Sequence, residues 1–342
     1  MKGEVIVIGG GPAGMEAASR LAKAGINVTL AEKEKDTGGN LLKWHHLFPD
    51  RRKSSEVLKY LSGSIKTGNI KLMPGTRITS INRKGNSLVA TTNSGESIYT
   101  DAIVVATGFE LFNSSRKEEY GYGIYENVIT SADLEQMFNN GKLILHNGQV
   151  PEKFGIIHCV GSRDEKVGNL YCSKLCCVTA VKQAIEIKEH IPESKIFCFY
   201  MDMRMGGAYY EELYRESQEK YGISYIRGKV SEVGVDIENK LIVKVEDTLA
   251  GRPLKMKLDM VILMAGMEMS FHGQKLAVAS GLNTGENKFF ESADKHYGTN
   301  RSNIKGVFYA GSCTEPMNIS DTISHARSAA SEVVNYLNNG KQ

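Results

Sequence analysis

Four of the six cysteines in the 342-residue chain lie between positions 159 and 177, in the stretch CVGSRDEKVGNLYCSKLCC. These are Cys159, Cys172, Cys176 and Cys177. The opening MKGEVIVIGG has an apolar run too short for a membrane span, and it lacks the flanks of a secretory signal. We therefore expect a cytoplasmic protein with reduced thiols, in which this group indicates a metal site or catalytic thiols rather than two disulfides.

The residues after Cys172 read SKLCCVTAVKQAIEIKEHIP, with apolar residues at helical spacing. We expect Cys172 at the N-terminus of this helix, Cys176 one turn later on the same face, and Cys159 at the end of a preceding strand. The positive end of a helix favours thiolates. Four thiolates suit a tetrahedral zinc ion or a [4Fe–4S] cluster. Structural zinc is typical of small modules with C-x-x-C pairs, so the helical setting favours an iron–sulfur cluster. A chance group of buried thiols is the third alternative.

Residues 4–34 read EVIVIGGGPAGMEAASRLAKAGINVTLAEKE, in the order strand, glycine turn, helix and strand of a dinucleotide-binding fingerprint. Gly9 permits the tight turn, Gly11 lets the backbone approach a pyrophosphate, and Gly14 lets the helix pack closely on the sheet. The free N–H groups of the helix attract phosphate. Glu32 stands at the end of the second strand, 18 residues after Gly14, where it would accept hydrogen bonds from ribose hydroxyls.

Two further segments indicate that the nucleotide is FAD. TDAIVVATGFE, residues 100–110, is an apolar strand that ends in Ala-Thr-Gly, and residues 303–339 predict a strand, a glycine turn and a long helix. Two-dinucleotide flavoproteins are similar here. We predict an α/β fold with two Rossmann-like domains, one inserted in the other. Residues 1–145 and 260–342 would form the FAD-binding domain, and residues 146–259 the inserted domain that carries the iron–sulfur motif.

The inserted segment departs from the thioredoxin reductase class in two ways. After the strand KFGIIHCV, the residues Val-Gly-Ser-Arg at 160–163 lack the second and third glycines of a nicotinamide site. Neither GGNLLKWHHLFPD nor the inserted segment contains a C-x-x-C pair, and the vicinal Cys176 and Cys177 would form only a strained disulfide. These departures argue against an ordinary nicotinamide site and against simple disulfide reductase chemistry.

Nearly the whole chain resembles the A-type subunit of heterodisulfide reductase, through VIVIGGGPAGMEAA, CVGSRDEKVGNLYCSKLCCVTAVKQAIEIKEH and GVFYAGSCTEPMNISDTISHARSAA. That family holds a [4Fe–4S] cluster beside its FAD with this cysteine spacing. The resemblance implies Cys159, Cys172, Cys176 and Cys177 as cluster ligands. The residues that we expect to contact FAD are Gly9, Gly11, Pro12, Ala13, Gly14, Glu32, Lys33, Gly39, Asn40, Leu41, Ile78, Thr107, Gly108, Gly311, Ser312, Ile319 and Thr322.

The resemblance also implies a function. We expect an oxidoreductase: an FAD and [4Fe–4S] electron-transfer subunit, homodimeric, that works with B- and C-type subunits of a heterodisulfide reductase-like complex. Methanogen members carry ferredoxin-like C-x-x-C-x-x-C modules that this chain lacks, which argues against electron bifurcation. Its length is more similar to the short A-type subunit of the heterodisulfide reductase-like complex of sulfur-oxidising prokaryotes, and so sulfur metabolism is the expected setting. The alternatives are a stand-alone NAD(P)H-dependent flavin oxidoreductase and a non-catalytic scaffold.

The charge composition and a few single residues complete the expectations. The chain has 42 basic and 39 acidic residues and no basic block, so we expect no nucleic-acid partner. Cys198 lies in an apolar strand and is interpreted as a core thiol, while Cys313 follows a glycine turn and is a candidate flavin neighbour. Trp44, His45 and His46 form either a surface or interface cluster or a group that exchanges protons with a flavin.

Overall fold

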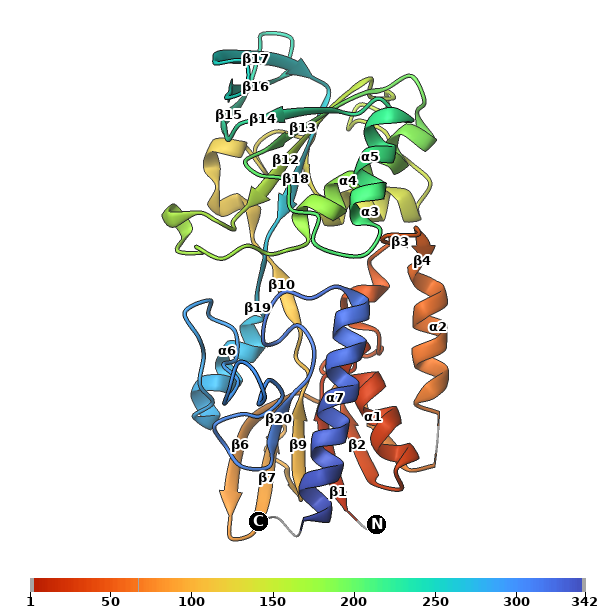
Figure 1. Cartoon of the computed structure of the whole chain (residues 1–342), viewed down its shortest axis with the longest axis vertical. Coiled ribbons are helices and arrows are strands. Elements are labelled where there is room, and N and C mark those ends of the chain that lie inside the picture. Colours follow the sequence, from red (N-terminus) through yellow and green to blue (C-terminus); the bar gives the residue numbers. More distant parts are fainter. Residues whose placement is uncertain (1–2, 67, 340–342) are drawn as a thin grey trace. The chain divides into compact units, whose positions relative to one another are not determined.

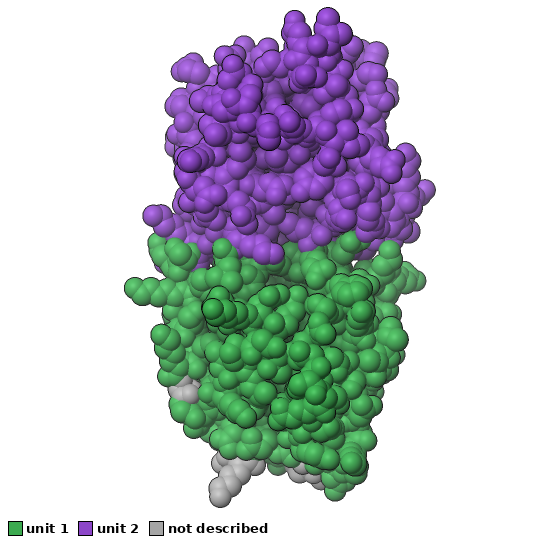
Figure 2. All heavy atoms as spheres, turned by 180° about the vertical axis from the view of Figure 1, so that it is seen from behind, with its two compact units in different colours: residues 1–42, 55–110, 268–342 green, residues 43–54, 111–267 purple. Residues whose placement is uncertain are grey.

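The computed structural model describes residues 3–66 and 68–339. The chain forms two compact units, coloured separately in Figure 2. Unit 1 comprises residues 1–42, 55–110 and 268–342, and unit 2 comprises residues 43–54 and 111–267. The chain passes from one unit to the other after residues 42, 54, 110 and 267. The last two crossings lie in β10 (Phe109–Leu111) and β19 (Met267–Met269), which form a two-stranded sheet.

Unit 1 is built on a parallel five-stranded sheet in the order β20-β9-β1-β2-β5. Figure 1 labels β20, β9, β1 and β2. Its strands are β1 (Glu4–Ile8), β2 (Asn27–Ala31), β5 (Ile70–Met73), β9 (Ala102–Val105) and β20 (Val307–Tyr309). The central strands β1 and β9 consist almost entirely of buried apolar residues. Continuous apolar strands are typical of a parallel sheet that is covered on both faces.

Helices α1 (Pro12–Lys23) and α7 (Ile319–Asn338) pack against each other and against this sheet. The unit also contains most of α2 (Ser54–Ser64), the short η1 (Gly39–Leu42) and an antiparallel sheet of β6 (Ile78–Lys84), β7 (Ser87–Thr92) and β8 (Ser97–Thr100). Helix α6 (Phe271–Ser280) packs on β6. Segments from both ends of the chain therefore form one sheet.

Unit 2 has a second parallel sheet, in the order β11-β18-β12-β13-β14. Its strands are β11 (Val128–Thr130), β12 (Lys153–Val160), β13 (Lys195–Tyr200), β14 (Ser224–Arg227) and β18 (Met260–Ala265). Helices α3 (Ser131–Asn139), α4 (Cys176–His190) and α5 (Tyr210–Glu219) follow β11, β12 and β13. This repeated strand-then-helix order is what the Rossmann-like prediction requires.

The two faces of this sheet are covered differently. Phe154 and Ile156 of β12 share a core with residues of α3, α4 and α5, whereas Ile157 and Val160 share a second core with an antiparallel sheet. That sheet comprises β15 (Val230–Val235), β16 (Leu241–Asp247) and β17 (Arg252–Leu258). The smaller elements of unit 2 are β3 (His46–Leu47), β4 (Arg52–Lys53), η2 (Ser114–Arg116), η3 (Glu118–Tyr120) and η4 (Glu165–Val167).

The compact units and the predicted domains have different limits. The sequence predicted a division at residues 145 and 260, whereas the units divide after residues 110 and 267, and residues 43–54 also belong to unit 2. The reason is strand pairing, because Val128–Thr130 of β11 pairs with residues 261–263 of β18. No helix in the described ranges is long and apolar enough to cross a membrane.

Candidate cofactor sites

The glycine turn after β1 is built by close backbone approach. A Cβ on Gly14 would lie 1.7 Å from the Gly9 carbonyl oxygen, and a Cβ on Gly9 would lie 2.4 Å from the Ala106 carbonyl oxygen. Gly9 also has a φ of +108°, which side chains rarely adopt. A Cβ on Gly11, in contrast, would meet no described atom within 4 Å. Gly9 and Gly14 are therefore needed by the fold, whereas Gly11 faces open space that a ligand can approach.

This open side lies at the N-terminus of α1. Gly11 is the N-cap and supplies no side-chain cap, and Pro12 occupies the first helical position. The first N–H groups of a helix have no partner within the helix, so this end is suited to an anion. A Cβ on Gly39 would lie 3.2 Å from Gly11 Cα, which brings the predicted glycine of η1 to the same turn.

Glu32 follows β2 and is buried. Its Oε2 accepts a hydrogen bond from Gly10 N at 2.6 Å, and its Oε1 accepts one from Glu34 N at 2.8 Å. Each carboxylate oxygen has a second lone pair, so these contacts fix the carboxylate and leave capacity for hydroxyl donors. The predicted ribose-binding acid therefore lies beside the glycine turn, fixed by two backbone donors.

The segment after β9 contains an unpaired polar atom. Thr107 Oγ1 is buried and has no hydrogen-bond partner among the described residues. Buried hydroxyls normally have one, and an unpaired hydroxyl beside a glycine turn indicates a place for a ligand. The backbone N of Thr107 lies 3.4 Å from the Cβ that Gly9 would carry, so this segment borders the glycine turn.

The C-terminal segment reaches the same region. A Cβ on Gly311 would lie 2.6 Å from the Cβ of Ala13, so close packing at α1 requires glycine here. The Ser312 and Thr322 hydroxyl oxygens lie 3.3 Å apart, which joins the turn after β20 to α7. Cys313 is fully buried, its thiol donates to Val105 O and Ala310 O, and burial raises its pKa to about 12. The structure gives Cys313 a packing role.

The remaining predicted FAD contacts are more scattered. Asn40 Nδ2 donates to Phe109 O at 3.0 Å, and Leu41 is buried. Lys33 is partly exposed and forms an ion pair with Glu34. Ile78 is buried at the start of β6, and Ile319 is the first residue of α7.

The cysteines lie in unit 2, after β12. Helix α4 begins at Cys176, with Leu175 as its N-cap, so Cys172 lies in the preceding loop. The prediction that Cys172 starts the helix was therefore wrong. Lys174 has a φ of +58°, outside the right-handed helical region, which prevents the helix from reaching back to Cys172. Cys176 and Cys177 instead occupy the first turn of α4.

The four thiols interact with one another. A hydrogen bond with Cys176 lowers the pKa of Cys159 to about 7, with help from the charges of Arg163 and Arg204. The same contact raises the pKa of Cys176, and burial raises that of Cys177 to about 11. The charge of Cys172 also acts on Cys176 and Cys177. Cys159 therefore ionises before Cys176 and Cys177, because its hydrogen bond with Cys176 and the charges of two arginines favour its thiolate.

The backbone around the cysteines is strained. Cys159, Arg163 and Lys174 all have φ between +54° and +58°, and the register of β12 against β18 shifts between Ile157 and Val160. Such shifts re-aim a side chain, and left-handed non-glycine residues cluster at functional sites. The strand therefore turns Cys159 out of its regular alternation.

Buried contacts anchor the loop between Cys159 and Cys172. Lys117 Nζ lies 2.7 Å from Asp164 Oδ2, and both side chains are almost fully buried. Ser173 Oγ accepts from Met267 N, and Tyr171 donates to Met267 O, at 2.8 Å each. These contacts fix the position of the cysteine loop within unit 2.

The donor set fits a thiolate-ligated cofactor in its chemistry. Ser162 Oγ and Arg163 Nη1, close to Cys159 in the chain, are buried and have no hydrogen-bond partner among the described residues. Within residues 3–66 and 68–339, however, no three His, Cys, Asp or Glu side chains are arranged to hold one metal ion. A single ion needs all its sulfurs at about 2.3 Å, whereas four cluster thiolates each bind a different iron.

Several residues at these sites could not be recognised from the sequence. Arg163 and Arg204 act on Cys159, and Lys117 anchors the cysteine loop through Asp164. Lys117 lies 47 positions from Asp164, and only tertiary contact reveals that pairing. Cys198 is fully buried, as a core thiol should be.

Comparisons with known proteins agree with this arrangement. Residues 3–139 match the family described as pyridine nucleotide-disulphide oxidoreductase. The thioredoxin reductases of T. acidophilum and Lactococcus lactis superpose with TM-scores of 0.67 and 0.68, each at 18% identity over 98% of this chain and at least 98% of theirs. The predicted fold, that of a two-dinucleotide-binding flavoprotein, is therefore confirmed.

Sequence relatives are more specific. The A-type subunit of the H(2)/formate:CoB-CoM heterodisulfide,ferredoxin reductase of Methanococcus maripaludis is 39% identical over 71% of this chain and 38% of its own length. The A-type subunit of the ferredoxin:CoB-CoM heterodisulfide reductase of Methanosarcina mazei is 30% identical over 98% of this chain and 53% of its own length. The chain belongs to the family of heterodisulfide reductase A-type subunits. The predicted oxidoreductase class is thereby confirmed at the level of the family.

The chain spans about half the length, or less, of these relatives. The alignment with the Methanosarcina protein runs over 424 positions, more than the 342 residues of this chain. That relative therefore contains inserted residues that have no counterpart here.

Proposed function

We propose that this chain binds FAD in unit 1 and a [4Fe–4S] cluster in unit 2, and passes electrons between them within a heterodisulfide reductase-like complex. The observation that carries the proposal is the presence of two different cofactor-type sites in one chain. One is a glycine turn with an open face at Gly11, and the other is a set of four interacting thiols. Sulfur metabolism is the setting we propose, with B- and C-type subunits as partners.

The FAD proposal rests on polar groups in unit 1 that retain unused hydrogen-bonding capacity. The N-terminus of α1 would hold the pyrophosphate, Glu32 the ribose, and Thr107 would use its unpaired hydroxyl. The remaining predicted FAD contacts are proposed on the same basis. A bound flavin accepts two electrons and can release them one at a time.

The cluster proposal rests on the chemistry of the thiols. Cys159, Cys172, Cys176 and Cys177 would each bind one iron, and Arg163 and Arg204 would offset the negative charge of the thiolates. Helix α4 begins at Cys176, so its N-terminal dipole adds to this effect.

A glycine substitution tests the FAD site. Gly11→Ala should leave the stability of the protein unchanged, because its Cβ meets no described atom, but it should weaken FAD binding about tenfold or more, since the methyl blocks the phosphate approach. The measurement is a fluorescence titration of apoprotein with FAD. Gly63→Ala on α2, whose Cβ also meets nothing within 4 Å, is the matched control. Equal affinities in both variants would refute this pyrophosphate site.

A cysteine pair tests the cluster site. Cys176→Ser should lower the iron and sulfide content of anaerobically purified protein, whereas Cys198→Ser, at a fully buried cysteine outside the proposed set, should leave it unchanged. Burial and the charge of Cys177 raise the pKa of the Cys198 thiol. Cys198 therefore lies near the proposed ligands without being one of them, which makes it a suitable control. Loss of iron in both variants, or in neither, would count against the assigned ligands.

The second candidate function is a stand-alone NAD(P)H-dependent flavin oxidoreductase, which the thioredoxin reductase-like fold favours. Mixing the FAD-loaded protein with NADH or NADPH separates the two functions. The role within a complex predicts slow flavin bleaching, because the turn at Gly161 is filled by Phe112. Fast, saturable bleaching would favour the stand-alone enzyme.

A further inference from the structure

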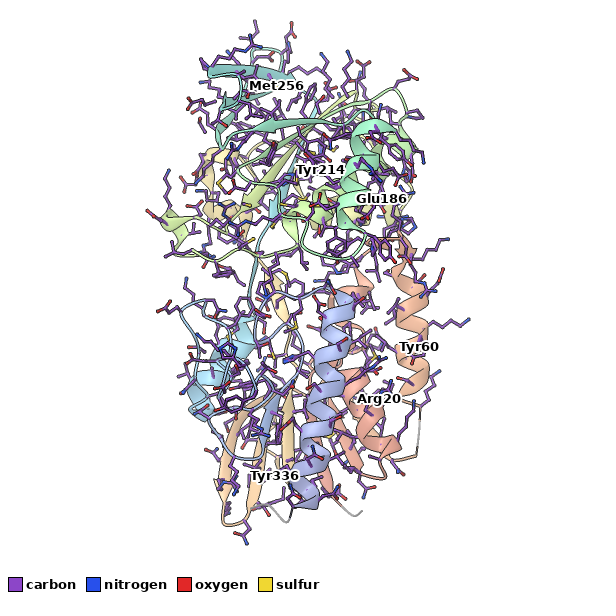
Figure 3. The ribbon with its side chains drawn as sticks, viewed as in Figure 1. Arg20, Tyr60, Glu186, Tyr214, Met256 and Tyr336 are labelled. Atoms are coloured by element: carbon purple, nitrogen blue, oxygen red, sulfur yellow. The ribbon has the colours of Figure 1, made fainter. Side chains whose placement is uncertain are left out.

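Unit 2 contains a buried ionic network that the proposed electron transfer does not use. Lys182 and Glu186 lie one turn apart on α4 (Figure 3 labels Glu186), and Glu135 lies on α3. Each of these side chains is no more than 3% exposed. Lys182 Nζ lies 2.5 Å from Glu135 Oε1 and 3.3 Å from Glu186 Oε2. Two carboxylates therefore share one buried ammonium group.

The two carboxylates have different surroundings. Glu135 accepts hydrogen bonds from Lys182 Nζ and Gln183 Nε2 at its Oε1, and from His45 N at its Oε2. Three donors, one of them charged, stabilise an ionised carboxylate. Glu186 has fewer donors: its Oε2 lies 3.3 Å from Lys182 Nζ, farther than Glu135 Oε1 does, and its Oε1 lies 2.8 Å from His46 Nδ1. Glu135 is thus the carboxylate that pairs with Lys182.

The charges of Glu135, Lys182 and Glu186 then indicate where one proton is bound. With Glu135 and Lys182 paired, an ionised Glu186 would be a buried charge without a full partner, which is costly. A proton on Glu186 Oε1, donated to Nδ1 of a neutral His46, removes that charge. His46 lies in β3 with its side chain 21% exposed, so the histidine side of the contact reaches water.

We propose that Glu186 and His46 form a proton-binding site in unit 2 that takes up one proton from water and returns it through the imidazole. In release, the Glu186 O–H bond breaks and an N–H bond forms at His46 Nδ1, while the Nε2 proton of the same ring leaves to water. Uptake is the reverse. The ring stays neutral before and after and changes only its tautomer. The proposal is independent of the proposed electron transfer.

Burial and the surrounding charges favour proton exchange between Glu186 and His46 near neutral pH. Burial raises the pKa of Glu186 to about 7, against the opposing effect of Lys182. Burial and the charge of Lys182 lower the pKa of His46, which keeps its ring neutral. The other titratable groups that face the pair are Glu135, His45, Lys53 and Glu189. The acid therefore ionises in the pH range where the imidazole is uncharged.

Infrared difference spectroscopy over about pH 5.5 to 8.5 tests the site directly, because this range brackets the titration of a carboxyl group that ionises near neutrality. The wild-type protein should show the carbonyl band of one protonated carboxylic acid that disappears with a midpoint of about 7. Glu186→Gln should lack this band. Glu189→Gln, at a partly exposed position on the same helix, should retain it. Absence of the band from the wild-type protein, or its persistence in Glu186→Gln, would overturn the proposal.

A second measurement needs only the wild-type fold. In protein labelled with ¹⁵N-histidine, with His46 assigned by His46→Asn, the His46 ring should carry its proton on Nε2 below the midpoint and on Nδ1 above it. A ring that becomes doubly protonated as pH falls through that midpoint, or that keeps one tautomer throughout, would contradict the proposed transfer.

Discussion

At the scale of single residues, the glycines show what a sequence can and cannot reveal. The spacing of Gly9, Gly11 and Gly14 predicted the turn after β1, and the close approaches at Gly9 and Gly14 explain two of the three. In the sequence, Gly161 was only the one glycine present where a nicotinamide site needs three. Its Cβ would instead lie 2.0 Å from the ring of Phe112, 49 positions away in the chain. Only the fold reveals that reason.

Replacement of Gly161 should be destabilising. Gly161→Ala adds strain at a φ of +77° and a clash with Phe112, so we expect the free energy of unfolding to fall by about 2–4 kcal/mol. Gly222→Ala, at a φ of +63° with nothing within 4 Å, should cost only the backbone part, about 1 kcal/mol. Urea unfolding monitored by circular dichroism measures both, and equal losses would contradict the packing role of Phe112.

At the scale of elements, apolar runs predicted the central strands well. The order strand, turn, helix and strand predicted for residues 4–34 matches β1, α1 and β2. The start of helix α4 was predicted wrongly, because the left-handed conformation of Lys174 excludes Cys172 from the helix. No pattern in the sequence marks a lysine for that conformation. Similarity to flavoproteins predicted that the first and last segments form one domain, but the packing of α1 against α7 was not predicted.

An ion pair joins α1 to α7. Glu16 Oε1 accepts from Arg327 Nε at 2.6 Å and from Arg20 Nε at 2.8 Å, while Glu16 itself is 1% exposed. Burial raises the pKa of Glu16, but the two arginine contacts outweigh it and the net pKa is lowered. The stabilisation is therefore present above pH 4.5, where the unfolded side chain is ionised, and it is lost as pH falls through the lower folded pKa.

Neutralising this carboxylate should weaken the contact between the helices. Glu16→Gln should reduce the free energy of unfolding by about 1–3 kcal/mol at neutral pH, and by less as pH falls below 4.5, because the wild-type protein loses the same charge there. Glu332 lies on α7 and pairs with the half-exposed Arg301. Glu332→Gln breaks this surface pair and should lower the free energy of unfolding by less than about 1 kcal/mol. Thermal unfolding at neutral pH and at about pH 3.5 gives both values, and a pH-independent loss would refute the ionic account.

At the scale of the whole molecule, the order of strands and helices was enough to predict two Rossmann-like parts. The limits between them were not, because β11 joins β18 across about 130 residues of intervening sequence. The buried network of Glu135, Lys182 and Glu186 was also outside sequence reasoning, since an i,i+4 Lys-Glu pair is usually a surface feature. Glu32, which the spacing of the fingerprint indicated, does lie beside the glycine turn, because that spacing reflects a fixed backbone geometry.

Assembly is a prediction at the same scale. We expect the pure protein to be a homodimer that reduces artificial dyes slowly and gains physiological activity only with partner subunits, since an electron carrier needs a donor and an acceptor. Sedimentation velocity at micromolar concentration should give the mass of two chains. A single boundary at 37.6 kDa would show a monomer.

The central claim is that one chain carries both a flavin and an iron–sulfur cluster. The most direct test is cofactor analysis of protein purified without oxygen and supplied with FAD, iron and sulfide. The account predicts about one FAD, four iron and four sulfide per chain. Stoichiometric zinc in place of iron, or a protein that binds no flavin after reconstitution, would contradict it.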